Sequence, residues 1–362
     1  ILLTLGGIAA AGLACNLLAW RLRLPSIFFL VLTGILAGPV LGWLNPDELL
    51  GDLLVPMVSL AVAIVLFEGS LTLKFRDIRG HGDVVRRLVT LGVLVTWLVG
   101  ALAAHLVLGW DLALSALFGA IVSVSGPTVV IPLLRTVRLK EPLASILRWE
   151  GILIDALGAI LAVLVFNFLA ATQLASGVRE VLEAMSTIVL VGLGLGALFG
   201  YLLGLAIRKF WVPDYLRDYM ALATVLLVFA GAESIAHESG LLAVTVMGVW
   251  LANMRDVELD DILNFKESLT LVLVAVLFIV LAARLNLGQL AALGSGVIGV
   301  LLILQLVAGP LRAMLSSVGS ELGWRERLFL GWMFPRGIVA AAVSALFALR
   351  LEQTGYPNAG DL

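Results

Sequence analysis

Long runs of apolar residues, separated by short polar stretches, follow one another through the whole chain. Twelve such segments can be marked, most of them close to the roughly 20 residues that an α-helix needs to cross a bilayer. They are 1–20, 26–44, 53–72, 88–108, 112–134, 143–172, 185–207, 219–238, 240–253, 267–284, 290–313 and 325–350. This pattern predicts an all-α polytopic membrane protein with twelve spans in this chain.

The composition agrees with this prediction and excludes several classes of protein. Hydrophobic residues make up 61 % and charged residues 13 % of the chain, whereas soluble domains carry about 25 % charged residues. A single cysteine and three scattered histidines leave no disulfide within the chain and no Cys- or His-based metal site. We find no motif of a membrane-embedded enzyme or of a P-loop ATPase. We therefore expect a protein that is not an enzyme, with no cofactor and no nucleic-acid partner.

Lysine and arginine residues alternate between the two sides of the predicted membrane. Loops after odd-numbered segments hold 19 of the 23 basic residues, counting Arg312 in the loop after the eleventh, whereas loops after even-numbered segments hold only Arg179 and Arg284. Basic residues mark cytoplasmic loops. The odd-numbered loops are therefore predicted to be cytoplasmic, which places the N-terminus of the chain outside.

Two segments contain helix-breaking residues at mid-membrane depth. The fifth carries Gly126 and Pro127, and the twelfth carries Pro335 and Gly337. Proline removes a backbone donor and clashes with the preceding turn, so each helix should break there. Interrupted helices in corresponding positions of two halves are typical of an inverted-repeat transporter. The two broken segments are seven segments apart, so segments one to six would correspond to segments eight to thirteen, with the seventh as a connector. This predicts a thirteenth span beyond this chain. We expect the chain to be the membrane core of a longer protein.

The sixth segment contains a carboxylate near the middle of the bilayer. Asp155 lies about 13 residues after Pro142, or roughly 20 Å along a helix. An ionisable residue at this depth marks an ion or proton pathway. A buried carboxylate can hold a proton or a monovalent cation, and this competition is sufficient for antiport. Because either form is neutral, we predict electroneutral exchange of one cation for one proton.

The broken fifth segment offers further oxygen ligands for a cation beside Asp155. Ser125 and Thr128 carry hydroxyls, and an unwound backbone around Gly126 would expose carbonyl oxygens. Each hydroxyl could equally bond to a carbonyl of its own helix.

Glu150 precedes Asp155 by five residues, and the two carboxylates do not share a helix face. Five residues turn a helix by about 140°. We predict that Glu150 forms a buried ion pair with Arg336 in the twelfth segment, because a buried arginine needs such a partner. The alternative is that Glu150 is a second carrier carboxylate.

Glu233 in the eighth segment is followed one turn later by His237. This pair could modulate the response to pH, or it could form a structural hydrogen bond.

Three local motifs resemble those of the bacterial NhaP-type and animal NHE-type cation/proton antiporters. They are Val124–Thr128, Glu150 followed by Asp155, and Phe334–Gly337. The resemblance implies an inverted-repeat, NhaA/NhaP-like fold of thirteen helices, a homodimer, and exchange of a monovalent cation for H⁺. Sodium is the first expectation.

The chain departs from the family pattern at three positions near the predicted ion site. Ile154, Gly126 and Gly151 stand where the family commonly has a side-chain oxygen. The ion carried is therefore open, and a K⁺/H⁺ antiporter of the same fold is the alternative. Outside the family, the alternatives are a proton-coupled symporter or a channel.

The resemblance also implies a division into domains. Residues 1–87 and 219–284 would form dimerisation-domain helices, 185–208 the connector, and 88–172 and 290–362 the two halves of a core transport domain. The broken spans, 112–134 and 325–350, lie in the core halves. We expect an integral protein of the bacterial inner (plasma) membrane, in contact with lipid and with a possible cytoplasmic C-terminal regulatory domain outside this chain.

Overall fold

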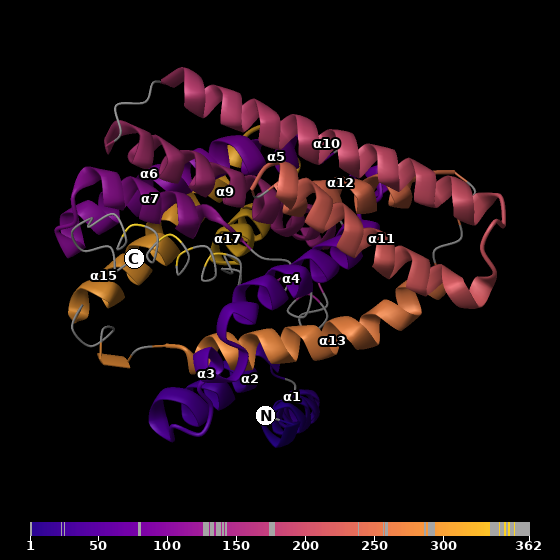
Figure 1. Cartoon of the computed structure of the whole chain (residues 1–362). Coiled ribbons are helices and arrows are strands. Elements are labelled where there is room, and N and C mark those ends of the chain that lie inside the picture. The colour runs from indigo at the N-terminus through magenta and orange to yellow at the C-terminus, as the bar shows by residue number, and fades with distance from the viewer. Residues whose placement is uncertain are drawn as a thin grey trace. The chain divides into compact units, whose positions relative to one another are not determined.

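The computed structural model describes most of the chain. The described residues are 2–22, 24, 26–78, 81–125, 130, 134, 139, 141, 143–173, 178–237, 239–255, 257, 260–285, 287–288, 294–333, 340, 344, 347 and 351. All regular secondary structure in this part of the chain is helical (Figure 1).

The chain divides into two compact units, each assembled from segments that are distant in the sequence. Unit 1 contains Ile1–Lys74, Ile131–Arg138 and Val189–Leu287, and unit 2 contains Phe75–Val130, Leu139–Ile188 and Gly288–Leu362. Unit 1 thus holds the predicted spans one to three and seven to ten, and unit 2 holds the remaining five. The dimerisation and transport roles expected for these groups of spans stay predictions.

The helices of unit 1 approach one another closely through glycines. These helices are α1 (Leu2–Leu22), α2 (Ser26–Ile35) extended by η1 (Leu36–Val40), α3 (Pro46–Leu50), η2 (Gly51–Leu53), α4 (Leu54–Leu71), most of α10 (Val178–Arg208), α11 (Asp214–Ile235), α12 (Ser239–Asn253) and α13 (Asp260–Ala283). A Cβ atom at Gly34 would lie 2.5 Å from the carbonyl oxygen of Ile279, and one at Gly196 would lie 2.4 Å from that of Ala243. The backbones of α2 and α13, and of α10 and α12, are therefore in contact, as small residues allow in membranes.

Unit 2 is built around two spans that contain π-helical turns. Its helices are η3 (Phe75–Ile78), α5 (Gly82–Arg87), η4 (Leu88–Gly92), α6 (Val93–Ala103), η5 (Ala104–Leu108), α7 (Leu112–Ser123), α9 (Leu143–Gln173), α15 (Ser295–Ile303), η6 (Leu304–Ala308), α16 (Gly309–Ser316) and α17 (Trp324–Trp332). Ala103, Val300, Leu304 and Ala308 form a buried apolar cluster between the predicted spans four and eleven.

Five described helices are long and apolar enough to cross a membrane. They are Leu3–Leu22, Gly82–Leu108, Ser186–Arg208, Asp214–Ile235 and Ser295–Ser316, and a helix pair bent by 78°, Pro46–Leu53 with Pro56–Leu71, could count as a sixth. Four further apolar helices are shorter. Each predicted segment contains a helix, but the lengths of the described helices do not confirm twelve crossings.

Candidate functional site

The helix α7 ends where the fifth segment was predicted to break. Its first turn is capped by Asp111, whose carboxylate accepts a hydrogen bond from the backbone N–H of Ala113 at 3.1 Å. The helix stops at Ser123, and Val124 is already extended, with φ −64° and ψ 124°. The predicted site residues Gly126, Pro127 and Thr128 lie outside the described residues.

The continuous helix α9 lies against both sides of this break. A Cβ atom at Gly158 would lie 3.0 Å from the Cα atom of Val124, and one at Gly151 would lie 2.9 Å from Cγ2 of Val130. No larger residue fits at either position without displacing its neighbour. The two glycines therefore bring α9 into contact with the chain before and after the break.

Asp155 lies between these two contacts on α9. It follows Gly151 by four residues and precedes Gly158 by three. At about 100° per residue, the three positions fall within about 60° of one another around the helix axis. The register of α9 thus places position 155 on the side of the helix that contacts the break.

Ser125 contributes a buried hydroxyl at the end of α7. Its Oγ atom has no hydrogen-bond partner among the described residues. The nearby hydroxyl of Ser123 is also buried, but it donates to the carbonyl of Ala120 at 2.6 Å. Buried polar atoms in proteins are nearly always paired, so the lack of a partner among the described residues makes Ser125 Oγ a candidate ligand for a cation.

Glu150 forms a buried ion pair with Arg312 of α16, through Oε1 and Nη1. The two residues are only 3 % and 1 % exposed. The placement of Arg312 in a cytoplasmic loop was therefore wrong, because α16 continues to Ser316 and carries the guanidinium into the interior. The predicted partner, Arg336, lies outside the described residues, so a contact between Glu150 and Arg336 stays a prediction.

Arg312 also binds the end of α17. Its Nη2 atom donates to the carbonyl of Met333 at 3.0 Å and to that of Leu330 at 3.3 Å. The last carbonyls of a helix have no partner within the helix, and a cation is stabilising there. The helix ends at Trp332, directly before the predicted second break. Pro335 and Gly337 themselves lie outside the described residues.

Sequence reasoning missed Arg312 because arginines near the end of an apolar segment commonly extend to water. The sequence did contain one indication that Arg312 is buried, because residue 312 lies inside the predicted eleventh segment, 290–313.

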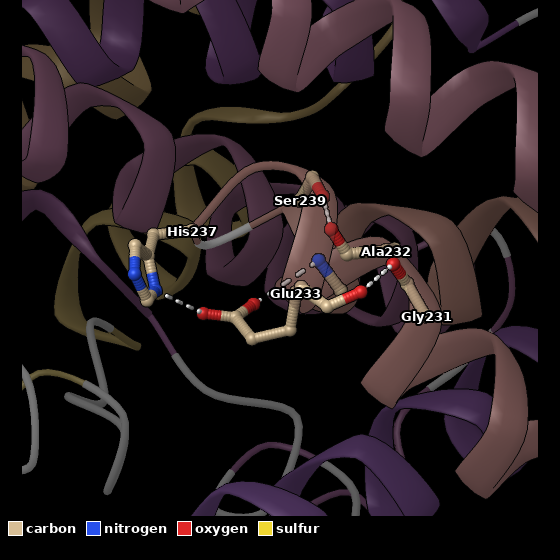
Figure 2. A network of polar contacts seen from close by, with 7 residues as sticks. Gly231, Ala232, Glu233, His237 and Ser239 are labelled. Carbon is tan, nitrogen blue, oxygen red and sulfur yellow. Dashed lines mark hydrogen bonds and ion pairs between the residues drawn. The ribbon is translucent and has the colours of Figure 1, made fainter.

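Glu233 and His237 join the end of α11 to the start of α12 (Figure 2). Glu233 Oε1 lies 3.3 Å from Nδ1 of His237, and Oε2 accepts a longer hydrogen bond, 3.4 Å, from the backbone N–H of Gly240. The Ser239 hydroxyl donates to the carbonyl of Ala232 at 2.8 Å. These contacts stabilise the corner between the two helices, and modulation of the pH response by this pair stays a prediction.

Comparison with known proteins assigns the chain to a family. Residues 7–358 match the family model described as sodium/hydrogen exchanger, transmembrane. The chain belongs to this family. Sodium/hydrogen exchangers are integral membrane transporters, which agrees with the apolar helices of both units.

Individual relatives differ in the cation that their names state. The chain is 24 % identical over 354 residues to Na(+)/H(+) antiporter 1 of Methanocaldococcus jannaschii, covering 92 % of this chain and 80 % of that protein. It is 29 % identical over 367 residues to the K(+)/H(+) antiporter NhaP of Alkalimonas amylolytica, covering 99 % of this chain and 61 % of that protein.

A solved structure shows the same fold. The sodium proton antiporter MjNhaP1 from Methanocaldococcus jannaschii, determined at pH 8, superposes with a TM-score of 0.83 at 24 % identity. The match covers 97 % of this chain and 89 % of that one.

Proposed function

We propose that this exchanger carries Na⁺ in one direction and H⁺ in the other, one for one, with Asp155 as the group that holds either ion. The register of α9 carries this proposal. Gly151 and Gly158 contact the two sides of the break, and position 155 lies between them on the same side of the helix. A carboxylate held beside interrupted backbone can combine its charge with backbone and hydroxyl oxygens, which hard cations prefer.

The hydroxyl of Ser125 is a further argument for a cation site beside Asp155. Its buried hydroxyl lacks a partner within the described part of the chain, and a bound cation would satisfy its oxygen. The backbone carbonyl of Gly126 and the hydroxyl of Thr128 are the further ligands we propose. With a cation or a proton bound, Asp155 is neutral, so the loaded site can cross between the two sides without moving net charge.

Potassium is the alternative cation, and two observations favour it. The relative named as a K(+)/H(+) antiporter is 29 % identical to this chain. Furthermore, Gly151 abuts Val130 at a distance that leaves no room for a hydroxyl-bearing side chain. With fewer side-chain oxygens, the site would compensate less for the strong hydration of Na⁺.

The proposal includes the architecture that the family resemblance implies. Twelve spans of a thirteen-helix inverted repeat would lie in the bacterial inner membrane, with the N-terminus of the chain outside. The protein would be a homodimer, and a core of spans four to six and eleven to thirteen would move. A C-terminal cytoplasmic region would regulate it.

The test uses the full chain, purified and reconstituted in proteoliposomes that contain a pH-sensitive dye. Addition of Na⁺, K⁺ or Li⁺ against a preset pH gradient should dissipate the gradient, and the most effective cation identifies the substrate. Asp155→Asn should abolish this response, whereas Asp52→Asn, at an exposed position of η2, should not. Undiminished exchange by Asp155→Asn would refute the proposal.

The same vesicles test the stoichiometry. An imposed membrane potential should leave the rate unchanged if one cation is exchanged for one proton. Cation uptake without opposite movement of H⁺ would instead indicate a channel, and movement of both ions in one direction would indicate a symporter.

A further inference from the structure

The corner between α10 and α11 lies at a membrane boundary. The helical stretches Ser186–Arg208 and Asp214–Ile235 are both long and apolar enough to span a bilayer, and residues 209–213 connect them. The connection therefore lies where two spans leave the hydrocarbon region. In this zone, aromatic and basic side chains contact lipid headgroups.

The corner contains a strained residue. The backbone N–H of Trp211 bonds to the carbonyl of Ala206, and that of Phe210 to the carbonyl of Ile207, both at 3.1 Å. These two bonds form a Schellman motif, whose left-handed position is usually glycine. Here the position is Phe210, with φ 52°, which among the described residues is the one non-glycine with positive φ. A bulky residue in this region is an outlier and raises the question of function.

Four aromatic residues at and near the corner have exposed side chains. Phe210, Trp211, Tyr215 and Tyr219 are 75 %, 64 %, 81 % and 71 % exposed. Tyr215 and Tyr219 are separated by one turn of α11 and therefore lie on one face of the helix. A glycine at 210 would relieve the strain but would remove one ring from this cluster, which we name the corner cluster.

Two cations of the corner have no acidic partner among the described residues. Arg208 and Lys209 are exposed, and Lys209 Nζ lies 5.3 Å from the ring centroid of Trp211. Arg217, in contrast, is buried beneath the Phe210 ring, at 5.3 Å from its centroid, and pairs with Asp214 at 2.6 Å. The remaining acid, Asp218, is partly buried. The accessible charge of the corner is therefore positive.

We propose that the corner cluster, together with Arg208 and Lys209, binds the headgroup of an anionic membrane phospholipid. Lys209 and Arg208 would bind the phosphate, and the exposed rings would lie at the depth of the headgroup and glycerol. Aromatic rings prefer this depth because they are apolar with a polar edge. The strain at Phe210 is retained because it holds a ring at the corner where the two basic residues lie.

The experiment measures lipid binding by the full chain in detergent. The apparent melting temperature is followed while phosphatidylglycerol or phosphatidylcholine is added. The parent protein should be stabilised at lower concentrations of phosphatidylglycerol than of phosphatidylcholine. Lys209→Gln and Arg208→Gln should each weaken the phosphatidylglycerol effect about fivefold, as expected for one basic residue near an anionic surface.

An exposed arginine that lies beside a tryptophan ring in another part of the chain serves as the matched control. Arg325 is exposed, and its guanidinium lies 5.5 Å from the ring centroid of Trp324, at the start of α17. Arg325→Gln should leave the phosphatidylglycerol response unchanged. Equal responses to both lipids, no effect of Lys209→Gln, or an equal loss in Arg325→Gln would each overturn the proposal.

The variant Phe210→Gly distinguishes lipid binding at the corner from a purely structural role of Phe210. Without lipid, its melting temperature should change little, because the free adoption of positive φ by glycine offsets the loss of the ring that covers Arg217. Its response to phosphatidylglycerol should be weaker. If Phe210→Gly keeps the full response, or if the charge variants alter only the oligomeric state, the lipid assignment is overturned. The readout is independent of ion exchange, so it can fail without affecting the proposed transport function.

Discussion

Glu150 and Arg312 form an ion pair inside unit 2 although they are 162 residues apart in the sequence. The pair connects α9, which carries Asp155, to α16. Arg312 also binds two carbonyls at the end of α17. One guanidinium therefore holds three helices at the place where the second break was predicted.

Removing one member of this pair should strongly destabilise the protein. Arg312→Met or Glu150→Leu alone leaves an uncompensated buried charge, which costs about 3–5 kcal/mol. The double variant should recover part of this loss, because neither charge remains. Recovery should be incomplete, since the carbonyls of Leu330 and Met333 lose their donor.

The measurement is thermal unfolding of the purified variants, with the folded yield in membranes as a second readout. A double variant that is as unstable as the sum of the two single changes would show that the residues act separately.

Gly158→Ala should impair both stability and exchange. The added Cβ would lie 3.0 Å from the Cα atom of Val124, a backbone atom that cannot rotate away. Overpacking of this kind costs about 1–3 kcal/mol. Gly231→Ala on α11 is the control, because no atom lies within 4 Å of its added Cβ. Melting temperatures and exchange rates of the two variants should differ clearly, and equal behaviour would contradict the close contact.

Ser125→Ala should weaken cation binding without destabilising the fold. The hydroxyl makes no hydrogen bond to any described residue, so its removal costs the fold little. If it is a cation ligand, the KM for the cation should rise about twofold to tenfold, as for the loss of one hydrogen-bond-sized interaction. Ser123→Ala removes a hydroxyl bonded to its own helix and should leave KM unchanged. An unaltered KM in Ser125→Ala would remove Ser125 from the proposed ligands.

Two glycines of α10 should differ sharply in their tolerance of alanine. A Cβ atom at Gly196 would lie 2.4 Å from the carbonyl oxygen of Ala243 on α12, whereas none lies within 4 Å at Gly194. Gly196→Ala should therefore lower the melting temperature. Gly194→Ala should preserve or raise it, because alanine favours helix by about 1 kcal/mol over glycine. Equal shifts would contradict the contact between α10 and α12, which run side by side in Figure 1.

The hydropathy pattern predicted the positions of the helices more accurately than their first and last residues. The sixth segment was expected over 143–172, and α9 covers Leu143–Gln173. The fourth was expected from residue 88, but the helix begins at Gly82, because its first turns carry charged residues that a hydropathy pattern excludes. The number of crossings could not be derived in this way, since several helices are shorter than a bilayer requires.

The candidate site could be proposed from the sequence where it depends on local residues, but not where it depends on long-range packing. Asp155 and the break near Pro127 stand out because a carboxylate and a proline are unusual at mid-membrane depth. The pairing of Glu150 with Arg312 depends on where the fold places α16 relative to α9, which no spacing in the sequence reveals. The contacts of Gly151 and Gly158 were equally hidden, because glycines are frequent throughout membrane helices.

The three-way attachment of Arg312 has a consequence for the working cycle. If α9, α16 and the end of α17 separated, a charge would be left unpaired in an apolar interior, at a cost of about 3–5 kcal/mol that makes the separated arrangement rare. We therefore expect α9, α16 and the end of α17 to move together when the protein changes conformation. A cation bound beside these helices would then keep its ligands through the cycle, and only its access to water would change.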